Sequence, residues 1–273
     1  MKKFCLIVNE EKDAGLSVAK EIKSYLEKSE SCVKICRHRD DFCLAEDTHM
    51  AIVLGGDGTV IQVAKKIAGK NIPILGINLG TLGFLTEVET PRIYPALDMV
   101  LSGRYDIEKR MILAGSVGKT EEKSLAVNEI IVGKRDIGRM ITTSVWVNEE
   151  LLDTYVADGV IVATPTGSTA YNLSAGGPVL SPNMEALVIT PICPHSLNKR
   201  SLVVSSEDRI MVRVEKTRES YVDEASVRCD GESLWSAETG DEVYIRKARE
   251  FFDVVCLGDV GFYEKMRSKL NRK

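Results

Sequence analysis

A short loop of glycines around one carboxylate is the stretch of this sequence best suited to chemistry. The apolar run at 52–54 ends at Gly55, Gly56, Asp57 and Gly58, and apolar residues then recur at helical spacing over 60–68. This pattern predicts a strand, a tight loop and a helix. Glycines can adopt positive φ and bring backbone N–H groups close to a ligand, and the N-terminus of the following helix favours an anion. The loop is therefore a candidate phosphate site.

Asp57 is the unusual member of this loop, because a carboxylate repels phosphate. Its presence indicates either a bridging cation or a proton acceptor aimed at a hydroxyl group beside the phosphate. The alternative is that Asp57 only caps the helix, since aspartate is favoured at that position. The loop lacks the spacing of the dinucleotide-binding fingerprint and the Gly-Lys-Ser/Thr of the P-loop.

A second cluster, rich in hydroxyl groups, lies at residues 157–178. An apolar strand that begins after Asp158 runs into the sequence Thr-Pro-Thr-Gly-Ser-Thr-Ala-Tyr and ends at Gly-Gly-Pro. Such a density of polar groups is costly to bury unless they bind something polar, such as a ligand with many oxygens. The alternative is an ordinary loop in which Ser168 or Thr169 caps a short helix.

Three smaller features accompany these clusters. Asn128 and Glu129 interrupt an apolar strand, and an amide that both donates and accepts suits an adenine edge or ribose hydroxyls. Phe84 is either an aromatic wall for a base or a core residue. The sequence 230–232, Asp-Gly-Glu, follows a strand and is typical of a hairpin turn.

Composition sets the class of protein. The 273 residues predict two domains, and the apolar and charged fractions of 44% and 28% are ordinary for a globular protein. The net charge of −4 disfavours general binding to nucleic acid or to an anionic membrane. We find no signal-like or membrane-spanning run, and seven cysteines fit a reducing compartment, so we expect a cytoplasmic protein. The cysteines at 32–43 lack the spacing of a zinc site.

Strands and helices alternate through the first part of the chain. We expect strands at 3–8, 33–36, 50–54 and 72–77 and helices at 13–28, 60–68 and 90–101, the last ending at Gly103. This alternation predicts an α/β, Rossmann-like domain with a parallel sheet over residues 1–103. In such sheets ligands bind at the carboxyl ends of the strands, where the glycine loop lies.

From residue 104 the strands follow one another without long helices. We expect them at 105–117, 124–132, 142–147, 151–156, 159–163, 209–214, 226–229 and 242–245. This pattern predicts a larger, all-β second domain over residues 104–250. A strand at 251–256 and a basic helix at 262–273 stand apart from this run, so we expect the tail, 251–273, to return to the first domain.

Taken together, these motifs resemble the NAD kinase family. The resemblance covers residues 55–59, 82–85, 128–129, 158–159, 164–174, 191–195 and 230–232, which occur in the family's order. The glycine loop is shared with diacylglycerol, sphingosine and phosphofructokinase-type kinases, whereas the Thr-Pro-Thr-Gly-Ser-Thr-Ala-Tyr run is far more specific.

The resemblance implies transfer of the γ-phosphoryl group of ATP, or in some relatives of inorganic polyphosphate, to the 2′-hydroxyl of NAD. Asp57 would be the catalytic proton acceptor, with Mg²⁺ or Mn²⁺ as cofactor. Family members are dimers or tetramers, which implies a homodimer or homotetramer with Asp158 serving a neighbouring subunit. The implied substrate contacts are Gly55, Gly56, Gly58, Phe84, Asn128, Glu129, Arg139, Asp158, Thr169, Ala170, Tyr171, Asn172, Leu173, Ser174 and Glu232.

The chain departs from the family pattern at two positions. Gln62 and Val156 stand where many relatives have a cation, so the grip on the phosphates must differ, with Lys65 or Arg139 as candidate substitutes. Two other functions compete with an NAD kinase. A lipid kinase should carry an apolar groove or a basic patch, which this acidic chain does not show. A non-catalytic NAD sensor would have no need of Asp57.

Overall fold

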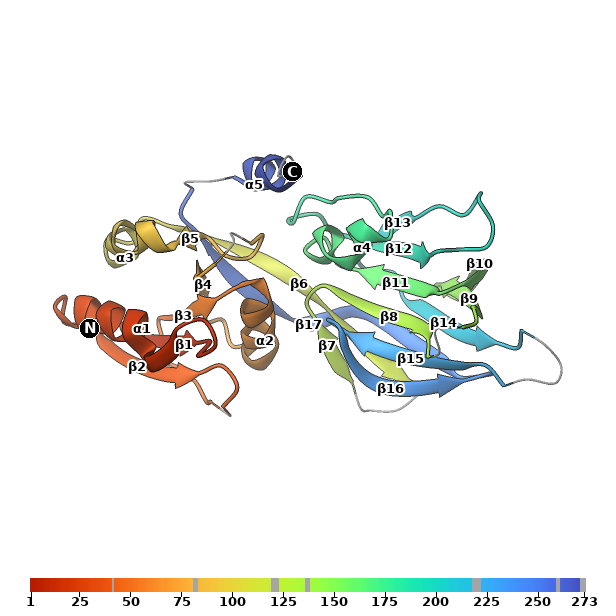
Figure 1. Ribbon diagram of the computed structural model, residues 1–273, viewed down its shortest axis with the longest axis horizontal. Coiled ribbons are helices and arrows are strands. Elements are labelled where there is room, and N and C mark those ends of the chain that lie inside the picture. Colours follow the sequence, from red (N-terminus) through yellow and green to blue (C-terminus); the bar gives the residue numbers. More distant parts are fainter. Residues whose placement is uncertain are drawn as a thin grey trace. The chain divides into compact units, whose positions relative to one another are not determined.

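Parallel strands that alternate with helices form one part of the structure (Figure 1). β1 (Lys3–Val8) lies between β2 (Cys32–Arg37) and β3 (Met50–Gly55), and β3 pairs with β4 (Ile74–Asn78). Every one of these pairs is parallel. The short β5 (Val88–Glu89) and Val254 near the end of β17 (Glu242–Cys256) also pair with β4. The carboxyl ends of β3 and β4 therefore lie side by side and support the glycine loop.

Helices cover both faces of this sheet. α1 (Ser17–Glu27), preceded by the 3-10 turn η1 (Ala14–Leu16), shares one buried cluster with α3 (Ile93–Leu101) and the strands. The 3-10 turn η2 (Thr90–Arg92) leads into α3. α2 (Asp57–Ile67) covers the opposite face. Successive side chains of a strand point to opposite faces of the sheet. A Cβ on Gly76 in β4 would lie 3.2 Å from Cγ2 of Val60 in α2, on the face away from α1 and α3.

The computed structural model describes residues 1–40, 42–80, 83–118, 123–135, 138–217, 222–258 and 261–270. The chain divides into two units, the first comprising Met1–Arg110 and Phe251–Lys273 and the second comprising Met111–Glu250. Both boundaries fall inside long strands, β6 (Asp106–Val117) and β17.

Two antiparallel sheets build the second unit. One contains β14 (Ile210–Glu215) between β9 and β17, with β10 pairing β9 and β6 pairing both β17 and β7. The other has the order β13-β12-β11-β8-β15-β16. The remaining bounds are β7 (Ser124–Ala126), β8 (Glu129–Lys134), β9 (Ile141–Val147), β10 (Glu150–Ala157), β11 (Gly159–Ala163), β12 (Ala186–Ile192), β13 (Leu202–Ser205), β15 (Glu224–Cys229) and β16 (Glu232–Glu238).

The core of the second unit lies between these two sheets. Val145, Tyr155 and Val212 of one sheet share a buried cluster with Val160 and Val227 of the other. The outer face of β11 and β12 packs against a smaller cluster that includes the segment after β11. That segment contains only a 3-10 turn, η3 (Gly167–Thr169), and one helical turn, α4 (Tyr171–Ser174). The expected fold class, an α/β unit followed by an all-β unit, is confirmed.

Sequence periodicity misses several strands. β12 is a buried apolar run that contains Pro191, and the sequence analysis did not assign it to a strand. β13 is apolar but largely exposed, and most of β16 is exposed, so neither shows the alternation of a half-buried strand. The expected strands at 242–245 and 251–256 are parts of one strand, β17. The charged run between them remains extended because Ala248 points inward while its neighbours are exposed or half-buried.

The C-terminal helix returns to the first unit, as predicted. In α5 (Phe262–Leu270), the Nζ of Lys265 lies 2.6 Å from Oε2 of Glu87 and 3.2 Å from the carbonyl oxygen of Thr86. Both charged side chains are buried, at 7% and 6% exposure. Glu87 also accepts the backbone N–H of Leu257 through Oε1 at 3.0 Å. The chain end is thereby tied to the segment after β4.

Two further expectations concern membranes and cysteines. Across the described ranges, no helix is long and apolar enough to span a membrane. All seven cysteines are free thiols, and all belong to the described residues. Cys5 and Cys229 are buried, whereas Cys193 is exposed and follows the end of β12 in a turn with a φ of 45°.

Candidate active site

The carboxylate of Asp57 binds the backbone of the segment after β4. Its Oδ2 accepts the N–H of Phe84 at 2.7 Å, and its Oδ1 accepts the N–H groups of Leu85 and Thr86 at 3.1 and 3.2 Å. The residue that caps α2 is Gly56, and no side chain among the described residues bonds the helix end. The capping interpretation of Asp57 is therefore wrong. Its carboxylate instead joins the start of α2 to residues 84–86.

Close approach explains the glycines of this region. A Cβ at Gly83 would lie 1.7 Å from Oδ1 of Asp57, and one at Gly55 would lie 2.4 Å from Oγ1 of Thr59. Neither can therefore carry a side chain. Gly55, Gly56 and Gly58 do not adopt positive φ, so the expected left-handed geometry is wrong. A Cβ at Gly58 would meet open space, in keeping with its exposed position in the first turn of α2.

Lys12 brings a cation to the glycine loop, which the sequence analysis missed. Its Nζ lies 2.7 Å from the position of a Cβ on Gly56 and 3.7 Å from that on Gly80. The ammonium group thus sits over the loop, beside the N-terminus of α2. The signal in the sequence is only a lysine in the turn after the first strand, at the sheet edge where ligands bind. Gln62, where relatives carry a cation, is exposed on α2.

An aspartate also braces the backbone of the second unit. Asp230 accepts the N–H of Val127 through Oδ2 at 2.9 Å and the N–H of Asn128 through Oδ1 at 2.7 Å. The N–H of Glu129 lies 3.4 Å from the same Oδ1. Asp230 and Gly231, with φ of 50° and 83°, form the two-residue turn of the β15–β16 hairpin. The interpretation of residues 230–232 as a hairpin turn is confirmed. The turn also fixes the backbone of residues 127–129 through Asp230.

Glu129 is a buried carboxyl group with an unused oxygen. Its side chain is 5% exposed, and Oε2 has no hydrogen-bond partner within the described residues. Burial, with a smaller contribution from Asp230, raises the pKa of Glu129 to about 8. A neutral carboxyl group donates and accepts hydrogen bonds at once, which suits a ligand hydroxyl. Asn128 beside it is half-buried.

The hydroxyl-rich segment packs against the same backbone. Thr164 donates its hydroxyl to the carbonyl oxygen of Val127 at 2.7 Å and its N–H to that of Asn128 at 2.8 Å. A Cβ on Gly167 would lie 2.1 Å from the Asn128 oxygen. The hydroxyl of Ser168 is likewise used internally, on Pro165 at 2.6 Å. Much of the density of hydroxyl groups therefore serves the protein's own backbone.

Asn172 is also engaged inside the fold. Its Nδ2 donates to the carbonyl oxygens of Ser168 and Pro178 at 3.2 and 3.1 Å, and its Oδ1 accepts the Thr190 hydroxyl at 2.7 Å. The side chain is fully buried. Its geometry suits it to hold the segment in place. Next to it, Thr169, Ala170 and Leu173 are half-buried and Tyr171 and Ser174 are exposed.

The second unit separates its predicted site residues into two places. Asn128 and Glu129 lie beside the end of β11, where Ala163 pairs with Glu129, whereas Asp158 precedes the opposite end, where Gly159 pairs with Gly133. Five strand residues, about 17 Å, lie between these ends. Asp158 forms an ion pair at 2.6 Å with Lys134, another residue that the sequence analysis missed. Arg139, which follows the Lys134 end of β8, and Glu232 at the β15–β16 turn are both exposed.

Phe84 lies in the first unit with the glycine loop. Its ring is half-buried, 6.1 Å from that of Phe262, and Nζ of Lys269 lies 4.3 Å from its centre. The first unit thus brings together Gly55, Gly56, Asp57, Gly58 and Phe84. Within the described parts of the chain, no three histidine, cysteine, aspartate or glutamate side chains could hold a metal ion.

Family models match both halves of the chain. Residues 6–105 match the ATP-NAD kinase N-terminal domain and residues 127–257 match the ATP-NAD kinase C-terminal domain. An NAD kinase of Lachnoclostridium phytofermentans is 39% identical over the whole of both chains. One of Moorella thermoacetica is 40% identical over 99% of this chain and 89% of its own.

Two solved structures of kinases of NAD or NADH have the same fold as this chain. An NAD kinase from Archaeoglobus fulgidus in complex with ATP has a TM-score of 0.77 and 28% identity, covering 98% of both chains. A yeast NADH kinase complexed with NADH, at 24% identity, shares the fold with a TM-score of 0.83 over 99% of this chain and 87% of its own. The fold, the glycine loop and these matches define a phosphotransferase of the kinase class. The chain belongs to the NAD kinase family, and its function is that of an NAD kinase.

The contact between Gly83 and Asp57 generates a first prediction. In Gly83→Ala, the new Cβ must displace residues 84–86 from the carboxylate, because it would lie 1.7 Å from Oδ1. We expect kcat for NADP formation to fall by at least about tenfold, as a misplaced reacting group costs that much or more. Gly261→Ala is the control, since its Cβ meets open space. An unchanged kcat in Gly83→Ala would contradict the role of this contact.

A second prediction follows from the pKa of about 8 for Glu129. Above the ordinary pKa of a glutamate the unfolded chain loses this proton, whereas the folded protein keeps it until about pH 8. The stabilisation is therefore complete below about pH 4.5 and lost as the pH rises through 8. We would measure the free energy of unfolding by urea, without ligand, between about pH 4.5 and 8. As the pH rises, the value for wild type should fall relative to that for Glu129→Gln, by up to about 1.4 kcal/mol per pH unit. Exposed Glu150→Gln is the control; parallel profiles for wild type and Glu129→Gln would refute the shift.

Proposed function

We propose that Asp57 positions the 2′-hydroxyl of the adenosine ribose of NAD for attack on the γ-phosphorus of ATP. A bond forms between the 2′-oxygen and phosphorus, the bond from phosphorus to the ADP oxygen breaks, and the hydroxyl proton leaves through Asp57 to solvent. The products are NADP and ADP. The observation that carries this assignment is the carboxylate held by three backbone N–H groups at the start of α2.

The hydrogen bonds to Asp57 favour an orienting role. A carboxylate offers about four acceptor positions, two on each oxygen. Oδ1 accepts the N–H groups of Leu85 and Thr86 and, at 3.5 Å, the Thr86 hydroxyl, whereas Oδ2 accepts only the N–H of Phe84, so one position on Oδ2 remains. The remaining position can accept the bond from a substrate hydroxyl. Because a carboxylate is a far weaker base than a ribose alkoxide, Asp57 takes the proton late, and positioning supplies most of the rate.

Backbone and cation together hold the phosphates in this proposal. Gly55, Gly56 and Gly58 expose backbone at the N-terminus of α2, whose dipole favours an anion. Lys12 adds an ammonium group directly over Gly56. We assign to Lys12 the task that a cation at position 62 performs in relatives.

A divalent metal fits this loop, although the described residues contain no dedicated ligand cage. Mg²⁺ keeps several waters and binds substrate phosphates together with one or two carboxylates. A phosphate-binding loop without a ligand cage among the described residues suits such an ion, because the donor phosphates and water would supply most of its ligands. The ion would neutralise charge on the phosphates. Mn²⁺ is an alternative metal, and inorganic polyphosphate is an alternative donor.

Groups of the second unit bind the adenosine half of NAD in this proposal. Asn128 presents an amide to the adenine or ribose, and the unpartnered Oε2 of Glu129 meets a ribose hydroxyl. Tyr171, with 44% of its surface exposed, is available to pack on a ring. Other contacts come from Thr169, Ala170, Leu173, Ser174 and Glu232, with Asn172 holding the segment. Arg139, beyond the Lys134 end of β8, would contact another part of the dinucleotide. Phe84 stays a candidate aromatic wall for a base.

Asp158 serves the nicotinamide half bound to a neighbouring subunit. Asp158 precedes the opposite end of β11 from Asn128 and Glu129, so it would contact a different part of a dinucleotide from theirs. Exposed apolar side chains, Leu151 and Val156 of β10 and Leu202 and Val203 of β13, support a homodimer or homotetramer. We infer a cytoplasmic enzyme, in keeping with its free thiols.

Asp57→Asn tests the mechanism. Purified protein with NAD, ATP and Mg²⁺ should form NADP, and the variant should lose about 10²–10⁴-fold in kcat while NAD binding, followed by calorimetry, changes little. Wild type that forms no NADP would refute the proposed reaction. A variant with undiminished kcat would refute the role of the carboxylate.

Lys12→Met tests the grip on the donor. Methionine keeps the length of the side chain but removes the charge, so we expect the KM for ATP to rise about tenfold, equivalent to about 1.4 kcal/mol of lost binding. The KM for NAD should change less. Lys28→Met, on an exposed position after α1, is the matched control. Equal KM values for ATP in wild type and Lys12→Met would remove Lys12 from the site.

A further inference from the structure

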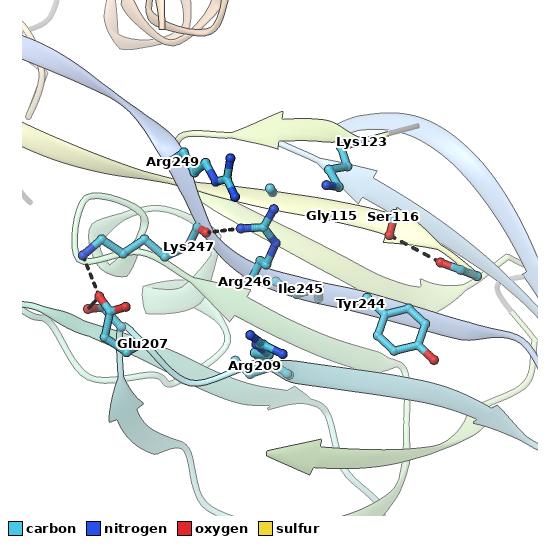
Figure 2. Close-up of a pocket in the computed structure, with 14 residues that line it drawn as sticks. Gly115, Ser116, Lys123, Glu207, Arg209, Tyr244, Ile245, Arg246, Lys247 and Arg249 are labelled. Atoms are coloured by element: carbon cyan, nitrogen blue, oxygen red, sulfur yellow. Dashed lines mark hydrogen bonds and ion pairs between the residues drawn. The ribbon is translucent and has the colours of Figure 1, made fainter. Parts of the chain in front are cut away.

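The second unit contains a cavity of about 500 Å³ whose lining is rich in cations. It lies against β6, the start of β14 and β17, and five lysine or arginine residues line it. Figure 2 shows Arg246 and Arg249 of β17 close to Lys123, with Arg209 lower on the same side of the cavity. None of the residues that line it belongs to the site proposed for NAD and ATP.

The charges of this cavity are not balanced. Among the described residues that line it, Glu207 is the only carboxylate, and it is paired at 3.0 Å with Lys247, which also binds Glu185 at 2.7 Å. Arg246 donates Nη1 only to the carbonyl oxygen of Lys247, at 3.3 Å. Across the described residues, Arg246 and Arg249 have no carboxylate partner.

The same holds for two more cations, Arg209 and Lys123, whose charged groups also have no acidic partner in the described part of the chain. The backbone of Arg209 donates its N–H to Oδ1 of Asn148 and accepts the Asn148 N–H at its carbonyl oxygen, both at 2.9 Å. Four like charges that share one hollow repel one another, and an anion with several charges would relieve that repulsion.

The side-chain types narrow the class of anion. A guanidinium group is planar and forms paired hydrogen bonds with phosphate oxygens, and three of the four unbalanced cations are arginines. The hydroxyl groups of Ser116 and Tyr244 also line the cavity but already donate inside the protein, to the carbonyl oxygen of Gly118 and to Glu242, so the arginines and lysines remain the donors for an anion. From these observations we infer that this cavity binds a chain of phosphate groups, at a second anion site outside the proposed active site.

Such a chain has two possible sources, inorganic polyphosphate and a nucleoside triphosphate. An adjoining cavity of about 580 Å³ shares Arg209 and Tyr244 with the first and is lined also by Trp146. An indole ring beside the arginines offers a surface on which a base could stack. The inference does not rest on the proposed function, because binding can be measured without NAD or catalysis.

Calorimetric titration with inorganic tripolyphosphate, without Mg²⁺ and at 0.15 M salt to screen surface binding, tests the site. Wild type should bind one more equivalent than Arg246→Gln/Arg249→Gln, or bind at least tenfold more tightly at that site. Lys20→Gln/Lys28→Gln also removes two positive charges, one in α1 and one directly after it, and should behave as wild type. NADP formation without tripolyphosphate should be normal in the arginine variant and shows that it is folded.

Two outcomes would overturn the inference. One is equal stoichiometry and affinity in wild type and the arginine variant. The other is binding of citrate as tight as that of tripolyphosphate, since a site built for phosphate should prefer it. Arg246→Lys keeps the positive charge but loses the paired hydrogen bonds of the guanidinium group. It should therefore weaken binding less than the double variant does.

A second arm separates the two sources. ATP is titrated into Asp57→Asn while tryptophan fluorescence is followed. If nucleotides are the ligand, ATP binds more tightly than tripolyphosphate, and Trp146→Phe removes the fluorescence change. If the phosphate chain alone is recognised, the two affinities agree. ATP and tripolyphosphate that both bind the arginine variant as they bind wild type refute the site.

Discussion

The bond between one carboxylate and three backbone N–H groups is the constraint on which the first unit's site depends. Asp57 begins α2, and the residues that it binds follow β4, so this contact joins the ends of two neighbouring strands. It requires glycine at position 83, where any side chain would collide with the carboxylate. Charge-assisted hydrogen bonds of this kind are short and directional, and they hold the carboxylate in one orientation.

The second unit uses the same device for a different purpose. Asp230 at the β15–β16 turn binds the backbone of residues 127–129, which places Asn128 and the buried Glu129 side by side. The hydroxyl groups after β11 complete the arrangement from the other side. In both units an aspartate fixes irregular backbone beside the side chains proposed to bind ligands, and these side chains lie on loops supported by strands.

The C-terminal segment supports the site of the first unit from a distance in sequence. Lys265 and Glu87 form a buried ion pair next to the residues that Asp57 binds, and Lys265 also bonds Thr86. Removing one partner of such a pair leaves a buried charge without compensation, which is strongly destabilising. The last helix therefore contributes to the geometry of a loop that precedes it by about 180 positions.

The sequence by itself determined the α/β and all-β classes, the strand–loop–helix around Asp57 and the family, since periodicity and short motifs are local properties. It did not reveal β12, β13 and β16, whose extended backbone is stabilised by pairing with neighbouring strands. Nor did it reveal that β17 continues through its charged run. Only the tertiary structure placed Lys12 over Gly56, turned the Asp57 carboxylate onto residues 84–86 and put Asp158 at the far end of β11 from Glu129. The physical reason is that side-chain direction and burial are set by residues distant in the chain, which no local pattern records.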